Sequence, residues 1–263
     1  MKKIVALVAV LFSVVMPVQS QATESKSLVI IDSYFDSRVI SGNVTCVTPQ
    51  GTACLYTAKL PLPASLSHNT NHGNAMVEVA KKQNPSIGII AISAAGPATD
   101  VNAGHFIESL RWVEKNYNKV SAVSVSRFFN GPATCTPASI NTAQYGGVIG
   151  ADQTIKSLIL SLKDKGVPVF ASTGNKAGTK IDYPACIVDT NSVSVGAMNR
   201  KGVLVSSYAL DSNTDFLATS DVYNYKSPVF GLITNSTSAG TVAIAATFAT
   251  NAQLVGKVIA VKP

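Results

Sequence analysis

The sequence has 263 residues, a formal net charge of +7 and four cysteines. This length suits one sizeable domain or two small ones. The positive charge is spread along the chain rather than gathered in a run. We find no zinc-ligand spacing, phosphate-binding loop or RNA-binding aromatic motif in it, so nucleic acid is not an expected partner.

Residues 1–22 have the pattern of a secretory signal peptide. Two lysines precede an apolar stretch from Ile4 to Val15, and residues 20–22 offer the small residues that signal peptidase reads. The apolar stretch is too short to span a bilayer comfortably, and an uncleaved N-terminal anchor is the alternative. We expect removal of this segment to leave one domain, residues 23–263, with a formal charge of +5, no membrane span and a secreted or periplasmic location.

An even number of cysteines in an exported chain predicts two disulfides. Cys46 and Cys54 are close together and would close a small loop, whereas Cys135 and Cys186 would join two distant loops. This pairing is the natural one, but three connectivities are possible and the spacing does not choose among them. The cysteines form no Cys-x-x-Cys motif, so a catalytic or metal-binding role is not expected.

Short apolar, β-branched segments recur along the chain and predict strands. They are Leu28–Ile31, Ile87–Ile92, Val120–Val125, Val167–Ala171 and Val193–Val195. Continuous apolar runs of this kind fit strands that are buried on both faces of a parallel sheet.

Amphipathic patterns between these segments predict helices. One pattern has apolar residues at spacings of four, three and four, namely Phe106, Leu110, Val113 and Tyr117. A second pattern consists of Ile155, Leu158, Ile159 and Leu162. Asp152 is the candidate N-cap of the second helix and Gly166 its candidate stop. The alternation of strand and helix predicts an α/β fold with a mainly parallel central sheet flanked by helices.

Four polar residues stand where a parallel sheet would gather them. Asp32 ends the first expected strand, and Asn175 follows the fourth. His72 begins a helix-like segment, and Ser238 begins a long helix of small residues, Ala239 to Ala252. Because ligands bind at the carboxyl ends of parallel strands, these residues form a candidate site.

These residues and their neighbours resemble the motifs of the subtilase family of serine peptidases, whose order is Asp, His, Asn and Ser. The matching segments are Val-Ile-Ile-Asp-Ser at Asp32, His-Gly-Asn-Ala at His72, Thr-Gly-Asn at Asn175 and Ser-Thr-Ser-Ala at Ser238. Further matches follow in order at 84–86, 124–126, 183–185, 194–197 and 215–218. The resemblance covers roughly residues 27–255 and implies a compact, divergent member with the three-layer subtilisin-like fold.

The resemblance implies a catalytic triad of Asp32, His72 and Ser238, with Asn175 as the oxyanion donor. In that mechanism the imidazole takes the proton of the serine hydroxyl, and the carboxylate orients the imidazole and stabilises its charged form. The implied substrate-binding residues are Ser126, Arg127, Phe128, Thr173 and Gly174. The implied function is that of a secreted serine endopeptidase, monomeric, acting on polypeptides without a cofactor or metal ion.

Each candidate residue also has an ordinary interpretation. Asp32 and Asn175 suit turns, and Ser238 is one of several N-cap candidates. His72 suits a surface or capping position, as does His105 at the start of the Phe106 helix. Their occurrence together in the family order favours the enzyme. The alternatives are a binding or accessory protein with a vestigial site, and an esterase or amidase that uses the same triad.

The motifs also depart from the family pattern. Asp-Thr-Gly has become Asp32-Ser33-Tyr34, which puts a bulky ring near the carboxylate, and His-Gly-Thr-His lacks its second histidine. Ser236 replaces a glycine before the nucleophile, and Val242-Ala243 replaces Pro-His after it. The family's Ser-Leu-Gly-Gly in the substrate strand has become Ser126-Arg127-Phe128-Phe129, and the large side chains in place of the two glycines predict a narrow or unusual primary pocket.

Two further features of the family are not expected here. Nine residues, Thr23 to Ile31, separate the expected cleavage site from Asp32, which leaves no room for the family's propeptide. The segment after His72 reaches Pro85 quickly, so we expect no calcium site of the kind that family members hold in an insertion there.

Overall fold

The structure is a computed structural model. It describes residues 25–36, 40, 42–54, 69–95, 101–126, 151–175, 181, 183–187, 192–199, 201, 203, 214–219, 225–227, 231–233 and 237–250. Within these ranges, the core element is a seven-stranded sheet with the order β2-β3-β1-β4-β5-β6-β7. Its strands are β1 Ser27–Asp32, β2 Val44–Val47, β3 Ile89–Ser93, β4 Val120–Val125, β5 Val169–Ser172, β6 Ser192–Met198 and β7 Phe216–Thr219. All neighbouring strands in this sheet are parallel.

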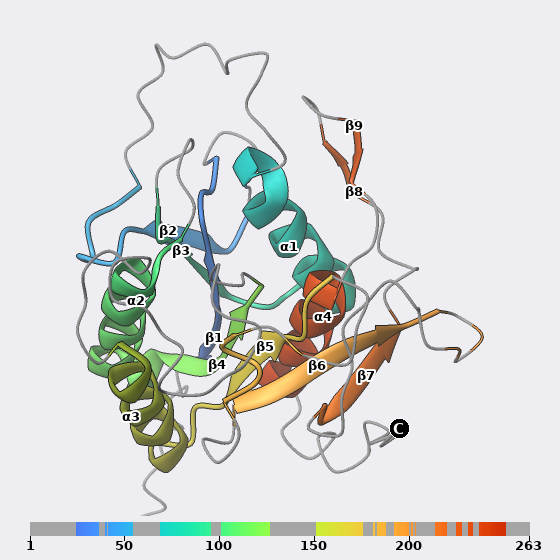
Figure 1. The fold of residues 1–263 in the computed structure, drawn as a ribbon. Helices are drawn as coiled ribbons and strands as arrows, with labels where there is room; N and C mark the ends of the chain where they lie inside the picture. Colours follow the sequence, from blue (N-terminus) through green and yellow to red (C-terminus); the bar gives the residue numbers. More distant parts are fainter. Residues whose placement is uncertain are drawn as a thin grey trace, which may run out of the picture.

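Helices cover both faces of the sheet (Figure 1). Helices α1 (Asn69–Gln83) and α4 (Thr237–Thr250) pack on one face. Helices α2 (Ala103–Lys115) and α3 (Ala151–Asp164) pack on the other. The structure therefore confirms the predicted α/β fold, with a parallel sheet between two layers of helices.

The side chains of β1 show how the sheet is buried on both faces. Leu28 and Ile30 pack in the core beneath α1 and α4, whereas Val29 and Ile31 pack in the core beneath α2 and α3. All four are at most 1% exposed. Burial of each such side chain contributes about 1.5–3 kcal/mol, so a continuous apolar run is what a central parallel strand requires.

The five strands predicted from apolar runs are all present, with ends shifted by a few residues. The edge strands β2 and β7 were not predicted, nor was the separate antiparallel pair of β8 (Tyr225–Ser227) and β9 (Gly231–Ile233). Strand β2 has only four residues, Val-Thr-Cys-Val, of which three are partly or fully exposed. Edge strands are short and lack burial on both sides, so their apolar signal is weak.

Helix α2 differs from the predicted helix at its C-terminal end. It ends at Lys115, and Tyr117 lies in a following 3₁₀ turn (η1, Tyr117–Lys119). Tyr117 is 41% exposed, so its prediction as part of the buried helix face was wrong. At the other end, Asn102 caps the helix by accepting the His105 N–H at 2.9 Å. Nδ1 of His105 in turn accepts the Asn102 N–H at 3.4 Å, in agreement with the capping role expected for that histidine.

Helix α3 confirms one predicted boundary and corrects the other. The helix already includes Ala151, so Asp152 lies within its first turn and is not the N-cap. At the C-terminal end, Gly166 has φ +75° and its N–H donates to the Lys163 carbonyl at 2.7 Å. A left-handed glycine just after the last turn is a common way to end a helix, as predicted.

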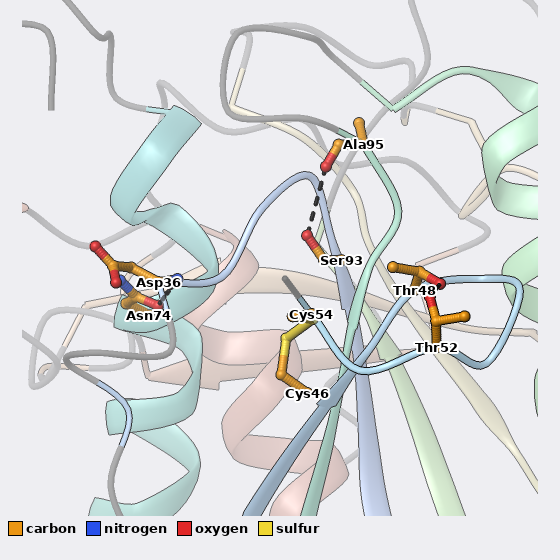
Figure 2. The surroundings of a disulfide bond; sticks show 8 residues. All are labelled: Asp36, Cys46, Thr48, Thr52, Cys54, Asn74, Ser93 and Ala95. Atoms are coloured by element: carbon orange, nitrogen blue, oxygen red, sulfur yellow. Dashed lines mark hydrogen bonds between the residues drawn. A yellow bond between two sulfur atoms is a disulfide. The ribbon is translucent and has the colours of Figure 1, made fainter. Parts of the chain in front are cut away.

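The loop that follows β2 is closed by the disulfide between Cys46 and Cys54, whose Cα atoms are 5.4 Å apart (Figure 2). This confirms the predicted close pair. Cys186 is also disulfide-bonded. Cys135 lies outside the described residues, so its pairing with Cys186 stays a prediction. In the part of the chain described here, no helix combines the length and apolarity needed to cross a membrane.

Candidate active site

The carboxyl ends of the central strands bring the candidate residues to one edge of the sheet. Asp32 is the last residue of β1, and Ser126 directly follows the neighbouring strand β4. Asn175 follows β5, which pairs with β4. Helices α1 and α4, which carry His72 and Ser238 in their first turns, pack against each other on one face of the sheet.

Asp32 and His72 form a buried pair. The Nδ1 atom of His72 lies 2.6 Å from Oδ2 of Asp32, and the two residues are 6% and 0% exposed respectively. Because an ionised carboxylate only accepts hydrogen bonds, the contact places the Nδ1 proton of the imidazole towards Oδ2. In a neutral imidazole with this tautomer, Nε2 is the nitrogen with a lone pair, which is the arrangement that a general base needs.

The other oxygen of the Asp32 carboxylate is held by the next residue. Oδ1 accepts the backbone N–H of Ser33 at 2.7 Å and its hydroxyl at 3.2 Å. These bonds fix the plane of the carboxylate, so that Oδ2 is directed at the imidazole. In the sequence, Ser33 is one of the residues of the Asp32 motif, and its contact with the carboxylate was not predicted.

Ser238 is the second residue of α4 and is only 3% exposed. Its hydroxyl donates to the backbone carbonyl of Ser126 at 3.0 Å. The hydroxyl proton is therefore directed at this carbonyl and not at an imidazole nitrogen. Of the contacts expected for the triad, the structure contains the one between Asp32 and His72, while Ser238 has a different hydrogen-bond partner.

Asn175 lies beside the N-terminus of α4. Its Oδ1 atom accepts the backbone N–H of Thr237 at 3.0 Å and the Thr237 hydroxyl at 2.9 Å. With the carbonyl oxygen occupied by two donors, the amide NH₂ is the group left for a ligand. The contact of Thr237 with Asn175 was not predicted, and the position of Thr237 next to Ser238 is the only sequence signal for it.

The remaining candidate residues fall into two groups. Ser126 and Thr173 are described; both are buried, and their hydroxyls have no hydrogen-bond partner within the described part of the chain. Gly174 has φ +105°, a backbone conformation that favours glycine and turns the chain towards Asn175. Arg127 and Phe128 lie outside the described residues, and so does the predicted narrow pocket they would form.

A separate cavity of about 560 Å³ lies where β1 begins, beside η1 and the C-terminal end of α2. Its lining includes Ser25, Ser27, Trp112 and Lys119. Because parallel strands begin and end at opposite edges of a sheet, this cavity is distinct from the candidate active site.

The chain has the fold of the subtilisin-like serine proteases, with the candidate residues at the carboxyl edge of its sheet. Among solved structures it is similar to the prenylagaramide maturation protease PagA, with a TM-score of 0.61 and 15% identity over 89% of this chain and 77% of that one. It is also similar to the nisin leader peptidase NisP from Lactococcus lactis, with a TM-score of 0.58 and 14% identity over 89% and 79% of the two chains.

A third similar structure is the epidermin leader peptide processing serine protease EpiP from Staphylococcus aureus, with a TM-score of 0.58 and 13% identity over 86% of this chain and 64% of that one. Identities this low establish a shared fold and leave the activity to be argued from the site. No protein-family model and no curated protein matches the sequence.

Proposed function

We propose that this chain is an exported serine endopeptidase of the subtilisin type, with Asp32, His72 and Ser238 as its catalytic triad. The observation that carries the proposal is the buried 2.6 Å contact between Asp32 and His72. A neutral imidazole oriented by a buried carboxylate, close to a helix that presents a serine in its first turn, is the arrangement that acyl transfer requires.

The proposed reaction begins with a rotation of the Ser238 side chain from the Ser126 carbonyl towards Nε2 of His72. The imidazole takes the hydroxyl proton as Oγ attacks the carbonyl carbon of the substrate. The same imidazole then gives that proton to the leaving amine, which produces an acyl-enzyme. Water, deprotonated by the imidazole, hydrolyses the ester and restores Ser238.

The negative charge on the substrate oxygen needs donors in the tetrahedral intermediate. The backbone N–H of Ser238 at the start of α4 is one proposed donor, since unpaired N–H groups at a helix N-terminus favour negative charge. The amide NH₂ of Asn175 is the second. Support for this role comes from the two hydrogen bonds that hold its oxygen on Thr237.

The proposed substrate is a polypeptide, and the protein is proposed to act as a monomer without a metal or cofactor. Residues 1–22 are proposed to direct export and to be removed, and residues 23–263 to form the single peptidase domain. The similar structures named for leader-peptide processing agree with a polypeptide substrate. We assign substrate contacts to Ser126, Thr173 and Gly174 and, beyond the described residues, to 127 and 128.

The main alternative is a subtilisin-fold binding or accessory protein with an inactive site. The hydrogen bond from Ser238 to the Ser126 carbonyl favours it, because that bond leaves the serine without a base. A hydrolase that acts on esters or amides through the same triad is a third candidate, since the triad does not dictate the leaving group.

A fluorophosphonate probe tests the proposal, because it labels only a serine that is activated by its neighbours. We expect the folded wild-type protein to be labelled, and the Ser238→Ala and His72→Ala variants to remain unlabelled. A folded wild-type protein that resists the probe would establish the inactive alternative. Comparison of peptide-library cleavage with ester hydrolysis then separates the peptidase from the other hydrolases.

A further inference from the structure

The chain from Asp32 to Asp36 crosses the first turns of α1 and is hydrogen-bonded to that helix at two points, once through a side chain and once through the backbone. Asp32 bonds His72 through its side chain, at 2.6 Å. Four residues later, the backbone N–H of Asp36 donates to the side-chain oxygen of Asn74 at 3.1 Å, as Figure 2 illustrates. Asp36 and Asn74 are only 3% and 2% exposed, so water does not compete freely for this bond.

Between these two bonds the loop is pressed against Gly73. A Cβ atom on Gly73 would lie 2.5 Å from the Tyr34 carbonyl oxygen and 2.8 Å from the ring of Phe35. Both distances are shorter than van der Waals contact. Phe35 is 1% exposed and packs in the core that α1 shares with α4. The contact therefore prevents the helix from moving closer to the loop, while the two hydrogen bonds oppose its moving away.

These contacts involve three consecutive helix residues, which constrains the rotation of the helix. Successive residues of an α-helix are separated by about 100° around its axis. The side chains of His72 and Asn74 therefore leave the helix in directions about 200° apart, and each is hydrogen-bonded to the loop. A rotation of α1 that moved the imidazole away from Asp32 would also stretch the bond at Asn74. The two bonds thus oppose the same motion from opposite sides.

We propose that Asn74 is a positioning residue that holds the His72 imidazole in register with Asp32. It touches neither of those side chains in the bonds described and acts through the Asp36 backbone and the orientation of α1. The inference rests on the proposed function in one respect, namely that the Asp32–His72 pair is catalytic. The positioning of the pair itself is a structural claim and is measurable without any activity.

The test uses a pair of variants with nearly the same shape. Asn74→Leu keeps the branched side chain but removes the acceptor, whereas Asn74→Asp keeps an acceptor oxygen. Gln83→Leu is the matched control, since it removes a hydrogen bond of a side-chain amide at the far end of the same helix. There, Nε2 of Gln83 donates to Thr247 at 2.9 Å. Urea midpoints show which variants are folded, and Asn74→Ala replaces the leucine variant if that one does not fold.

The first measurement is the rate of labelling by a fluorophosphonate as a function of pH. Misplacement of a reacting group by about 1 Å costs on the order of 10²-fold in rate, so we expect Asn74→Leu to react about 10–100-fold more slowly than the wild type. We also expect its pH profile to shift, since the imidazole loses its fixed contact with the carboxylate. Asn74→Asp should recover most of the rate, and Gln83→Leu should match the wild type in both rate and profile.

The second measurement is the downfield proton resonance of His72 Nδ1, recorded in a Ser238→Ala background. We expect this resonance in the parent and in Gln83→Leu, and its loss or upfield shift in Asn74→Leu. An unchanged resonance in folded Asn74→Leu would overturn the proposal, as would an unchanged labelling rate and profile. If the wild type resists labelling, the proposed function fails while the resonance still decides the role of Asn74.

Discussion

The Asp32 carboxylate accepts three hydrogen bonds at a site with no exposed surface. In such surroundings the attraction between the carboxylate and an imidazolium is stronger than in water. A proton taken by His72 from a nucleophile would therefore be stabilised by a charge that is already in place. Since the oxygens of the carboxylate are occupied by Ser33 and His72, this stabilisation requires no rearrangement during the reaction.

The proposed oxyanion donor gives a prediction at the same scale. Asn175→Ala removes the NH₂ group, and loss of one such donor typically lowers kcat by about 10²–10³-fold. Because the donor acts on the charge of the intermediate, KM should change little. Steady-state kinetics with a cleavable peptide check this. An equal loss in Asn175→Ala and the wild-type-like variant Gln83→Leu would point to a general effect on folding and contradict the assigned role.

At the scale of elements, the close approach of α4 to the sheet explains its small residues. Gly240 faces β7, and a Cβ atom added to it would lie 2.9 Å from the Cβ of Ala218. The helix has nine buried residues and supports both Ser238 and the core beneath it. A helix seated this closely cannot accept larger side chains on its inner face without moving away from the strands.

We therefore expect Gly240→Val to destabilise the protein by about 1–3 kcal/mol, the usual cost of overpacking. Urea denaturation measures the change. Gly166→Ala is the comparison, because its added Cβ has nothing within 4 Å and only the positive φ opposes it. That variant should lose about 1–2 kcal/mol from backbone strain alone, without any packing term. A Gly240→Val protein as stable as the wild type would contradict the packing described for α4.

A polar contact joins α2 to α3 and responds to pH. The hydroxyl of Ser161 and, at 3.2 Å, the ammonium of Lys165 donate to Glu114, and these contacts lower the pKa of Glu114 from its ordinary value of 4.5. A lowered folded-state pKa means that the stabilisation is fully present above the unfolded value and is lost as pH falls through the folded one. The side chains are 33% exposed, so the effect is small.

The expected result is that Glu114→Gln reduces the loss of stability on acidification below 4.5, because the variant has no carboxylate to protonate at this position. Urea midpoints at neutral pH and at a pH well below 4.5 measure the slope. Glu108→Gln is the matched control, since Glu108 belongs to an exposed ion pair on the same helix. Identical slopes for Glu114→Gln and the wild type would contradict the assignment.

At the scale of the whole molecule, the sequence predicted the central strands and missed the short ones at the edges. Continuous apolar runs identified β1, β3, β4, β5 and β6, whereas the edge strands β2 and β7 have only four residues each. The candidate catalytic residues were predicted from their positions after strands and at the starts of helices. The hydrogen bond of Ser238 to Ser126 was not predictable, because a serine rotamer depends on neighbours far away in the sequence.

The contact of Asn74 was missed for a related reason. Its sequence signal was a departure from a motif, and only the fold brings it next to the backbone of Asp36. The same loop passes Gly73, where an added Cβ would lie 2.5 Å from the Tyr34 carbonyl oxygen. Contacts between this loop and α1 depend on the fold, and the motif sequences alone do not show them.

The disulfides give a prediction for the whole molecule. We expect peptide mapping under non-reducing conditions to recover Cys46 joined to Cys54 and Cys135 joined to Cys186. The first bond is present in the structure, and Cys186 is bonded there as well. Recovery of either distant cysteine linked to the β2 loop would refute the second pairing. Mapping of the reduced and alkylated protein provides the control.

Helix α4 is the last described element of the chain, yet it contacts β1, β4, β5, β6 and β7. During synthesis, the segments that carry Asp32 and His72 are made long before it. Contacts between segments that are far apart in the sequence form slowly. In the proposed peptidase, the triad would therefore be complete only after the segment that carries Ser238 has been made and has packed on the sheet, so the earlier parts of the chain would fold before any hydrolysis begins.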